Sequence, residues 1–186
     1  MNIKGSQTEI NLLKAFAGES QARNRYTYFA SAARKEGLEQ IAAVFEETAN
    51  QEKEHAKRFF QFLEGGQVEI TATFPAGQIA KAIDNLQAAA DGEHEEWSAL
   101  YPAFAATARQ EGFEAIGRVF EAIGVAERNH ESRYRQFRST LASGEAFARN
   151  QAVTWYCRNC GYLHDGMEAP KACPACAHPQ AYFQAL

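Results

Sequence analysis

Two glutamate–histidine pairs stand out as candidate metal ligands, Glu52-x-x-His55 and Glu127-x-x-His130. The three-residue spacing places both side chains of a pair on one face of a helix. Apolar residues recur on that face at steps of three and four, so it is expected to point into a protein core. Buried without a partner, a carboxylate and an imidazole each cost several kcal/mol. A metal ion is the simplest partner for both.

An internal repeat relates the two pairs. A shift of 75 positions places the first pair on the second, and it places the Glu-Gly turn at 36–37 on the one at 111–112. The same shift superimposes the apolar stripe, Ile41, Phe45 and Phe62 on Ile116, Phe120 and Phe137. Glu-x-x-His pairs are common by chance, but two at equivalent positions of a repeat are not. The chain is therefore predicted to contain two copies of a helical hairpin with equivalent ligands.

Three further glutamates, Glu19, Glu93 and Glu96, fall on inward-facing helical positions. Taken singly, a glutamate on a helix is more often exposed to solvent than bound to a metal. One carboxylate from each of two helices, with a Glu-x-x-His pair from each of two others, is however the ligand set with which four-helix bundles hold two iron or manganese ions. Such oxygen-rich sites suit these metals better than copper or structural zinc. The expected di-metal ligands are Glu19, Glu52, His55, Glu93, Glu96, Glu127 and His130.

Four helices and one long crossover must position these side chains, which predicts an all-α four-helix bundle. The first helix is expected to start near Ser6 or Thr8 and to end at about Lys35, before Gly37. The second is expected to end at Gly65-Gly66. The crossover is expected at 65–77, a third helix from about Gln78 with Ile79 and Leu100 in its inward stripe, and a fourth helix at 114–143.

The third helix carries a predicted irregularity. Tyr26 maps onto Tyr101 by the shift of 75, whereas Glu19 maps onto Glu93 by a shift of only 74. One extra residue must therefore be accommodated, and a proline at 102 also predicts a kink or a bulge. We expect a one-residue π-bulge between residues 96 and 101, at or near the site.

All four cysteines lie close to the end of the sequence, in two Cys-x-x-Cys pairs with twelve residues between them. Clustered pairs of this kind favour a tetrahedral metal site over a disulfide framework, and the spacing alone leaves zinc and iron open. The expected ligands are Cys157, Cys160, Cys173 and Cys176. The surrounding segment is too small to hold a core unaided. We expect a bundle domain at 1–146, followed at 147–186 by a linker and a small metal-bound domain. The composition typical of a linker covers residues 144–153.

Charge and hydropathy exclude some classes of function. The net charge is −4, and because residues 147–186 carry three basic and two acidic side chains, the bundle carries −5. An acidic chain is not expected to bind nucleic acid. No apolar run approaches the roughly 18 residues of a membrane span, and the first residues lack the pattern of a secretory signal. A cytoplasmic protein is the expectation.

The complete set of motifs closely resembles the rubrerythrin family, over essentially the whole chain. The motifs are GESQARNRY, QEKEH, GEHEEW and VAERNH, followed by CRNCG and CPACA. The resemblance implies a ferritin-like di-iron domain and a C-terminal rubredoxin-like β domain with one iron on four cysteines. It also implies the ligand roles: Glu52 and Glu127 bridging, Glu19 and Glu93 terminal, His130 on one iron, and Glu96 and His55 exchanging on the other with oxidation state.

The resemblance further implies a non-haem peroxidase that reduces hydrogen peroxide to water in oxidative-stress defence. An external NAD(P)H-linked reductase or a rubredoxin would supply electrons through the rubredoxin-like iron, in a homodimer. Tyr26 and Tyr101 are either hydrogen-bond donors to ligand carboxylates or core aromatics. Ala177 stands where free-standing rubredoxins usually have glycine, which bears on the reduction potential. The alternatives are a ferroxidase or iron-handling protein, and a non-enzymatic metal-binding protein with zinc in the tail.

Overall fold

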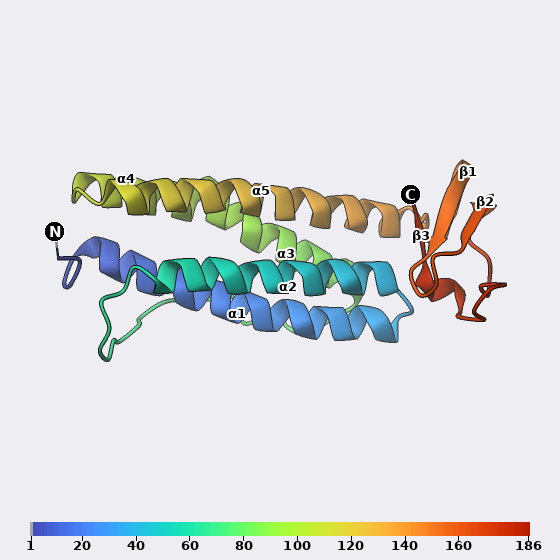
Figure 1. The fold of residues 1–186 in the computed structure, drawn as a ribbon, viewed down its shortest axis with the longest axis horizontal. Coiled ribbons are helices and arrows are strands. Elements are labelled where there is room, and N and C mark those ends of the chain that lie inside the picture. Colours follow the sequence, from blue (N-terminus) through green and yellow to red (C-terminus); the bar gives the residue numbers. More distant parts are fainter. Residues whose placement is uncertain (1) are drawn as a thin grey trace.

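The computed structural model describes residues 2–186, as four parallel or antiparallel helical rods with a small β-sheet region at one end (Figure 1). The predicted four-helix bundle with one long crossover is confirmed. Its helices are α1 (Gln7–Lys35), α2 (Glu39–Phe60), α3 (Ala82–Glu95), α4 (Tyr101–Gln110) and α5 (Glu114–Ala142). A π-helical turn, Glu96–Leu100, joins α3 to α4, so that these two helices together form one of the four helical rods. None of the helices in residues 2–186 combines the length and the apolar character needed to cross a lipid bilayer.

Capping interactions set the ends of α1. The Ser6 hydroxyl accepts a hydrogen bond from the Glu9 backbone N–H, as expected for an N-cap residue. At the other end Gly37 has φ +75°, a left-handed conformation that favours glycine. The N–H groups of Gly37 and Leu38 then bond back to the carbonyls of Arg34 and Ala33. This short turn makes α1 and α2 antiparallel neighbours.

The repeat extends to contacts that connect the two hairpins. Glu36 accepts a hydrogen bond from the N–H of Ala82, the first residue of α3, at 2.7 Å. Glu111, its counterpart 75 positions later, accepts bonds from the N–H groups of Gln7 and Thr8 at the start of α1, at 3.0 and 2.8 Å. Each Glu-Gly turn therefore caps the first helix of the other hairpin, which aligns the two hairpins along the bundle axis.

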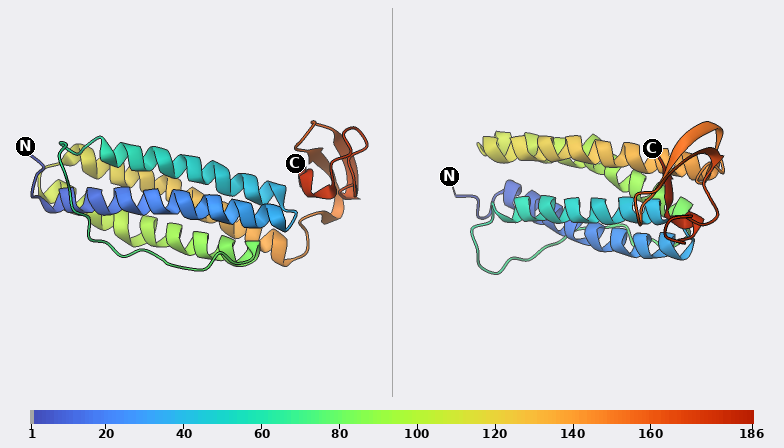
Figure 2. Two further views of the ribbon diagram at one scale, coloured as in Figure 1. Left: turned by 90° about the horizontal axis from the view of Figure 1, so that it is seen from below. Right: turned by 45° about the vertical axis from the view of Figure 1, so that its right-hand side comes forward.

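The crossover between α2 and α3 runs along the bundle because these two helices point in the same direction (Figures 1 and 2). The prediction that α3 begins near Gln78 is wrong by four residues. The Asn85 side chain accepts a bond from the N–H of Ala80 and donates one to its carbonyl, both at 2.9 Å, which holds the chain before Ala82 out of the helix. Ile79 is 59% exposed and not part of the inward stripe.

The predicted π-bulge is confirmed. The N–H of Tyr101 bonds to the carbonyl of Glu96, five residues earlier, within the π-helical turn at 96–100. The wider turn rotates every later side chain, so Tyr101 is 2% exposed whereas Leu100 is 38% exposed. The prediction that Leu100 faces inward is therefore wrong, because it extended the α-helical phase through the bulge.

Two apolar cores fill the bundle, one towards each end. The core nearer the β-sheet region includes Tyr26, Phe45 and Tyr134, and the other includes Phe59, Tyr101 and Phe120. The buried carboxylates lie between them on each helical rod. The bundle is thus apolar at both ends and polar in the middle, a distribution that would be unfavourable unless the polar section has a compensating group.

The cysteine-rich region is a three-stranded antiparallel sheet in the order β2-β1-β3, with β1 at Ala148–Cys157, β2 at Leu163–Glu168 and β3 at Phe183–Ala185. A short 3₁₀ helix, Gln180–Tyr182, precedes β3. The expected linker at 144–153 is wrong in its second half, because β1 begins at Ala148. The small core of the sheet region consists of Trp155, Cys157, Ala169, Cys173 and Phe183, of which two are cysteines. Phe147 packs against both this core and the adjoining bundle core.

Candidate metal centres

Each of the four helical rods contributes one fully buried carboxylate to the middle of the bundle. Glu19 in α1 and Glu127 in α5 are 0% exposed, and Glu52 in α2 and Glu93 in α3 are 1% exposed. Inward helical phase explains each position, since all four continue the apolar stripes of their helices. Four carboxylates that point at one another cannot be stable as anions without a neutralising charge.

These side chains form two overlapping groups of potential ligands. One consists of Glu19, Glu52, His55 and Glu127, and the other of Glu52, Glu93, Glu127 and His130, with the ligand atoms of each group within 4.8 Å of one another. Glu52 and Glu127 belong to both groups. Glu96 belongs to neither, so of the seven residues expected from the sequence the structure brings six together and leaves Glu96 beside them.

Both imidazoles face carboxylates from both hairpins. His55 Nδ1 lies 2.8 Å from Glu52 Oε2 and 2.9 Å from Glu127 Oε1. His130 Nδ1 lies 2.7 Å from Glu127 Oε2, 3.1 Å from Glu52 Oε1 and 3.7 Å from Glu93 Oε2. The two rings stack at 5.9 Å. The pairs related by the sequence repeat are therefore related in space as well.

Hydrogen bonds within the cluster leave many of its ligand atoms unsatisfied. His55 Nδ1 is hydrogen-bonded to Glu52 Oε2, but the following buried atoms have no hydrogen-bond partner: Glu19 Oε2, Glu52 Oε1, Glu93 Oε2, both Glu127 carboxylate oxygens and His130 Nδ1. Buried polar atoms are rarely left without a partner. Converging oxygen and nitrogen atoms that lack one fit a pair of iron or manganese ions.

The pKa values of the clustered side chains also indicate that the site is suited to cations. Burial, and then the neighbouring carboxylates, raise the pKa values of Glu19, Glu93 and Glu96 well above the usual range. Burial alone would lower the pKa of His130, but Glu127 and the other carboxylates raise it to about 12. Burial would also lower the pKa of His55, but Glu127 and Glu52 raise it to about 10. Without metal ions the cluster therefore retains protons that cations would displace.

Two tyrosines form reciprocal hydrogen bonds to Glu93 and Glu19. The Tyr26 hydroxyl of the first hairpin donates to Glu93 Oε1 of the second, at 2.5 Å, and the Tyr101 hydroxyl donates to Glu19 Oε1. Both phenols are buried, at 1% and 2% exposure. In each carboxylate the other oxygen is left without a hydrogen bond. The tyrosines thus fix one oxygen of the group and leave the second available to a metal ion.

Sequence reasoning did not single out two neighbours of this site. Tyr134 is fully buried one turn after His130, and its ring lies 5.5 Å from that of Tyr26. Glu131 accepts bonds from the Trp97 indole and from Arg135, which connects α5 to the π-helical turn. The inward stripe contained a signal for Tyr134, but the contact between Trp97 and Glu131 depends on the packing of two helices.

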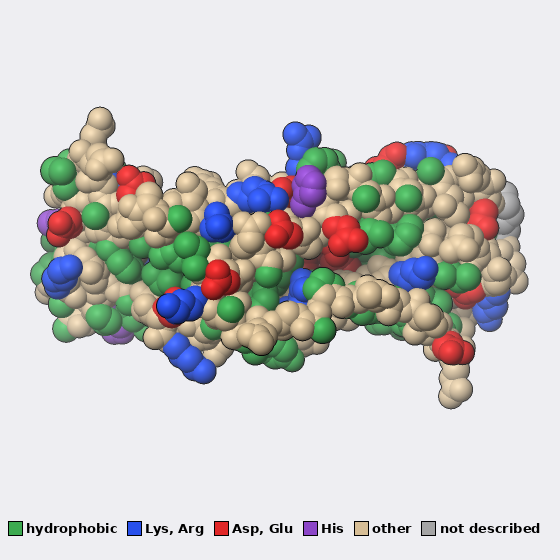
Figure 3. Space-filling model, turned by 180° about the vertical axis from the view of Figure 1, so that it is seen from behind, with side chains coloured by type: hydrophobic (Ala, Val, Ile, Leu, Met, Phe, Trp, Pro, Cys, Tyr) green, Lys and Arg blue, Asp and Glu red, His purple; other side chains and the backbone are tan. Residues whose placement is uncertain are grey.

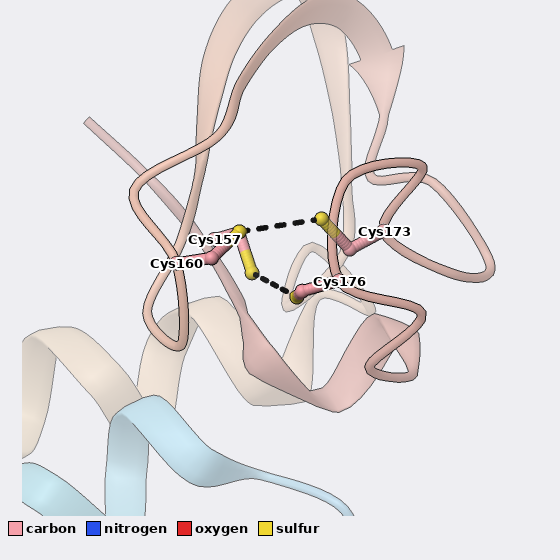
Figure 4. A group of neighbouring side chains, drawn as sticks. All are labelled: Cys157, Cys160, Cys173 and Cys176. Carbon is pink, nitrogen blue, oxygen red and sulfur yellow. Dashed lines mark hydrogen bonds between the residues drawn. The ribbon is translucent and has the colours of Figure 1, made fainter.

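The four cysteines form a second cluster, on two loops that face each other (Figure 4). The sulfur atoms of Cys157 and Cys176 are 3.8 Å apart, and those of Cys160 and Cys173 are 3.6 Å apart. A disulfide would require about 2.05 Å, whereas thiolates bound tetrahedrally at about 2.3 Å from one ion lie about 3.8 Å apart. The spacing therefore fits a single tetrahedral metal ion.

The two loops have the same local backbone. Gly161 follows the first Cys-x-x-Cys pair with φ +81°, and Ala177 follows the second with φ +60°. Their N–H groups bond to the carbonyls of Cys157 and Cys173. A hydrogen bond from the backbone N–H of His178 lowers the pKa of Cys176 to about 6, which favours the thiolate form that binds a metal.

Comparison with known proteins agrees with both clusters. The family model described as rubrerythrin matches residues 11–138, and the model described as the rubrerythrin rubredoxin-like domain matches residues 155–184. Rubrerythrin from Porphyromonas gingivalis is 62% identical over 185 residues, covering 100% of this chain and 92% of its own. Rubrerythrin from Nitratidesulfovibrio vulgaris is 58% identical over 185 residues, covering 100% and 97%.

A solved structure of nigerythrin in its fully reduced, all-ferrous state is also similar. It is 34% identical, with a TM-score of 0.64, and the match covers 99% of this chain and 91% of that one. The buried glutamate–histidine cluster is accordingly a di-iron carboxylate site, and the four cysteines form a rubredoxin-like site. Because both parts of the chain are matched in the order in which they occur, the protein belongs to the rubrerythrin family.

Proposed function

We propose that the protein is a non-haem di-iron peroxidase that reduces hydrogen peroxide to water in oxidative-stress defence. The observation that carries the proposal is the presence of two different metal clusters in one chain, a buried carboxylate cluster and a partly exposed thiolate cluster. A protein that only oxidises or stores iron has no need of the second cluster. In this proposal residues 1–146 form the catalytic domain and residues 147–186 form the electron relay.

The overlap of the two ligand groups supports a specific role for each glutamate. Glu52 and Glu127 belong to both groups and would bridge the two irons, whereas Glu19 and Glu93 belong to one group each and would bind terminally. His130 would bind one iron. His55 lies within the other group, and Glu96 neighbours the carboxylates of both groups, which supports the proposal that these two exchange as ligands with oxidation state.

Around these ligands the chain excludes water and fixes orientation. Two irons held by these carboxylates and imidazoles would supply the two electrons that, with two protons, convert hydrogen peroxide into two water molecules. Apolar cores close the site on both sides along the bundle. The Tyr26 and Tyr101 hydroxyl groups donate hydrogen bonds to Glu93 Oε1 and Glu19 Oε1, which orients the opposite oxygen of each carboxylate.

The position of the thiolate cluster supports a homodimer. The sheet region contacts the start of α2, where Phe183, Leu38 and Ile41 line one small cavity. Glu52 lies 13 residues further along α2 than Glu39, or about 20 Å at 1.5 Å per residue. Electron transfer weakens steeply with distance, so we propose that the rubredoxin-like iron of one subunit serves the di-iron site of its partner. The four cysteines form no disulfide bond with one another, which agrees with a cytoplasmic protein.

A spectroscopic and kinetic experiment tests the function. Protein loaded with iron and reduced by an NAD(P)H-linked reductase or a rubredoxin should lose the colour of its thiolate-bound iron and regain it when hydrogen peroxide is added. Glu127→Ala should abolish peroxide turnover and leave that colour unchanged. Cys160→Ser should slow reductase-driven turnover but not oxidation of chemically reduced protein.

Each alternative predicts a different result. Turnover that survives Glu127→Ala would remove the bundle from the mechanism. A colourless four-cysteine site would indicate zinc and exclude the relay. Rapid oxidation of Fe²⁺ by oxygen with slow peroxide reduction would favour a ferroxidase.

A further inference from the structure

A cavity of about 510 Å³ lies beside the di-iron site and is not used by the chemistry of hydrogen peroxide. It is bounded by α1, by the π-helical turn, by the start of α4 and by residues 71–75 of the crossover. Figure 3 shows the face that the crossover runs across, with a hollow near its middle and acidic side chains at the bottom of it. The crossover thus forms one wall of the hollow.

The cavity reaches the di-iron site directly. Glu96 and Tyr101 line it, and Gly18 lines it next to Glu19. A Cβ atom at Gly18 would lie 3.7 Å from Phe74 Cε1 and 4.0 Å from Glu96 Oε1. Gly18 therefore marks the point where the crossover, the cavity and a candidate iron ligand meet.

Size and lining are those of an organic ligand site. A molecule of liquid water occupies about 30 Å³, and hydrogen peroxide is little larger, whereas sites for organic ligands measure roughly 300–1,000 Å³. The apolar part of the wall includes Phe74, Pro75, Leu100 and Phe104. These apolar side chains offer no hydrogen-bonding group to hydrogen peroxide, but they would stabilise a bound hydrocarbon group by removing it from water.

Two cationic side chains, Lys14 and Arg25, line the cavity, and neither takes part in an ion pair among residues 2–186. Of the two, Arg25 is close enough to Glu96 for its charge to oppose the rise in the pKa of that carboxyl group. Of the two other half-buried arginines of the bundle, Arg133 is paired with Glu47, whereas Arg138 makes no ion pair. Arg25 thus brings a guanidinium group without an ion-pair partner to the wall of the cavity, near Glu96.

We propose that this cavity binds an organic hydroperoxide, with its alkyl or aryl group against Phe74, Leu100 and Phe104 and its two oxygens between Arg25 and Glu96. This inference rests on the proposed peroxidase function and extends it to a second substrate class. The oxygen–oxygen bond of ROOH breaks, and two electrons from the di-iron site with two protons from solvent yield ROH and water. The rubredoxin-like relay then restores the two electrons.

Filling the cavity at Gly18 separates the two substrates. Gly18→Leu projects a side chain into the cavity, while Gly18→Ala adds only the Cβ atom that the structure accommodates. In the iron-loaded protein, kcat/KM for cumene hydroperoxide should fall ~10-fold or more in Gly18→Leu, with that for hydrogen peroxide within about twofold of the parent value. Gly18→Ala should resemble the parent for both. Phe74→Trp fills the cavity from the crossover and should repeat the result if Gly18→Leu does not fold.

A binding measurement provides a readout that is independent of turnover. Calorimetric titration with 2-phenyl-2-propanol, the alcohol product of cumene hydroperoxide, should show binding to the iron-loaded parent protein and to Gly18→Ala, and binding ~10-fold weaker or more to Gly18→Leu. Equal loss of both peroxide activities in Gly18→Leu, or alcohol binding that is absent or unaffected by it, would overturn the inference. A parent protein that reduces hydrogen peroxide but neither binds the alcohol nor reduces cumene hydroperoxide would overturn this inference alone. Failure to reduce either peroxide would overturn the proposed function as well.

Discussion

The two metal clusters are built in opposite ways. The di-iron ligands come from helices as far apart in sequence as Glu19 and His130, and the four carboxylates that the two ligand groups contain between them are at most 1% exposed. The four cysteines lie within 20 residues, between Cys157 and Cys176, and Cys160 is exposed. The first cluster exists only when the bundle is assembled, whereas two short loops suffice for the second. A buried cluster suits chemistry that must exclude water, and an exposed one suits electron exchange with a partner.

Removal of the metals should have the largest effect, and it should differ between the two regions. The sheet region has a core of five residues of which two are thiols, so its metal is expected to supply on the order of 10 kcal/mol of folding free energy. The bundle retains both of its apolar cores. After chelation, hydrogen exchange should show residues 148–185 unprotected, while circular dichroism should show the helices intact. Loss of the helices with retention of the sheet would reverse the comparison.

Loss of either tyrosine hydroxyl should affect the di-iron cluster alone. Tyr26→Phe and Tyr101→Phe each remove a hydrogen bond to a carboxylate of the cluster, Glu93 or Glu19, and such partners are typically worth about 10–100-fold in metal affinity or activity. Peroxide turnover and competition with a chelator would measure the effect, and the spectrum of the thiolate-bound iron would be the control. The repeat makes the two positions equivalent, so the two variants should lose metal affinity or turnover to a similar degree. Losses that differ by more than about tenfold would show that the two halves of the site are not equivalent.

Stability of the metal-free bundle should decrease as pH rises above about 4.5. Above pH 4.5 the unfolded chain loses its carboxyl protons, but the raised pKa values of Glu19, Glu93 and Glu96 keep these groups protonated in the folded protein. The unfolded state then binds fewer protons, so the free energy of unfolding falls, by about 1.4 kcal/mol per pH unit for each such group.

Histidine ionisation adds to this trend. The stability contributed by His55 and His130, whose pKa values are raised to about 10 and about 12, is complete below pH 6.5 and is lost as pH rises. The lowered pKa of Glu127 acts in the opposite direction, since its contribution is lost as pH falls below 4.5. Urea unfolding at pH 5, 6, 7 and 8 would measure the slope. Metal-loaded protein should show the reverse slope, because metal binding displaces protons; a metal-free bundle that gains stability up to pH 7 would contradict this account.

The smallest predicted effect concerns the thiolate cluster alone. Ala177 has φ +60°, a conformation that costs a non-glycine residue roughly 1–2 kcal/mol. Glycine removes this strain but increases the entropy of the unfolded chain by up to about 1 kcal/mol. Ala177→Gly should therefore stabilise the iron-loaded sheet region by about 1 kcal/mol or less. Thermal unfolding followed at the iron absorbance would measure it, with unfolding of the helices as the internal control.

Local patterns carried much of the fold and of the candidate site. The one-residue mismatch between the shift from Tyr26 to Tyr101 and the shift from Glu19 to Glu93 was enough to predict the π-helical turn, which the structure contains. The same patterns misplaced Leu100, because helical phase cannot be extended through such a turn. The start of α3 was missed because the Asn85 side chain, not a recognisable N-cap, ends the crossover.

Residue type and spacing alone determined most of the side chains that face the interior and the presence of two metal sites, because helical phase and the Cys-x-x-Cys loop are properties of short stretches of chain. Only the tertiary structure decided that Glu52 and Glu127 are shared by both ligand groups while Glu96 lies beside them. It also decided that each tyrosine bonds a carboxylate of the other hairpin, and that a cavity of about 510 Å³ adjoins Glu96. These features depend on how helices separated by some 75 residues pack together, and the sequence of one helix contains no record of its neighbour's side-chain positions.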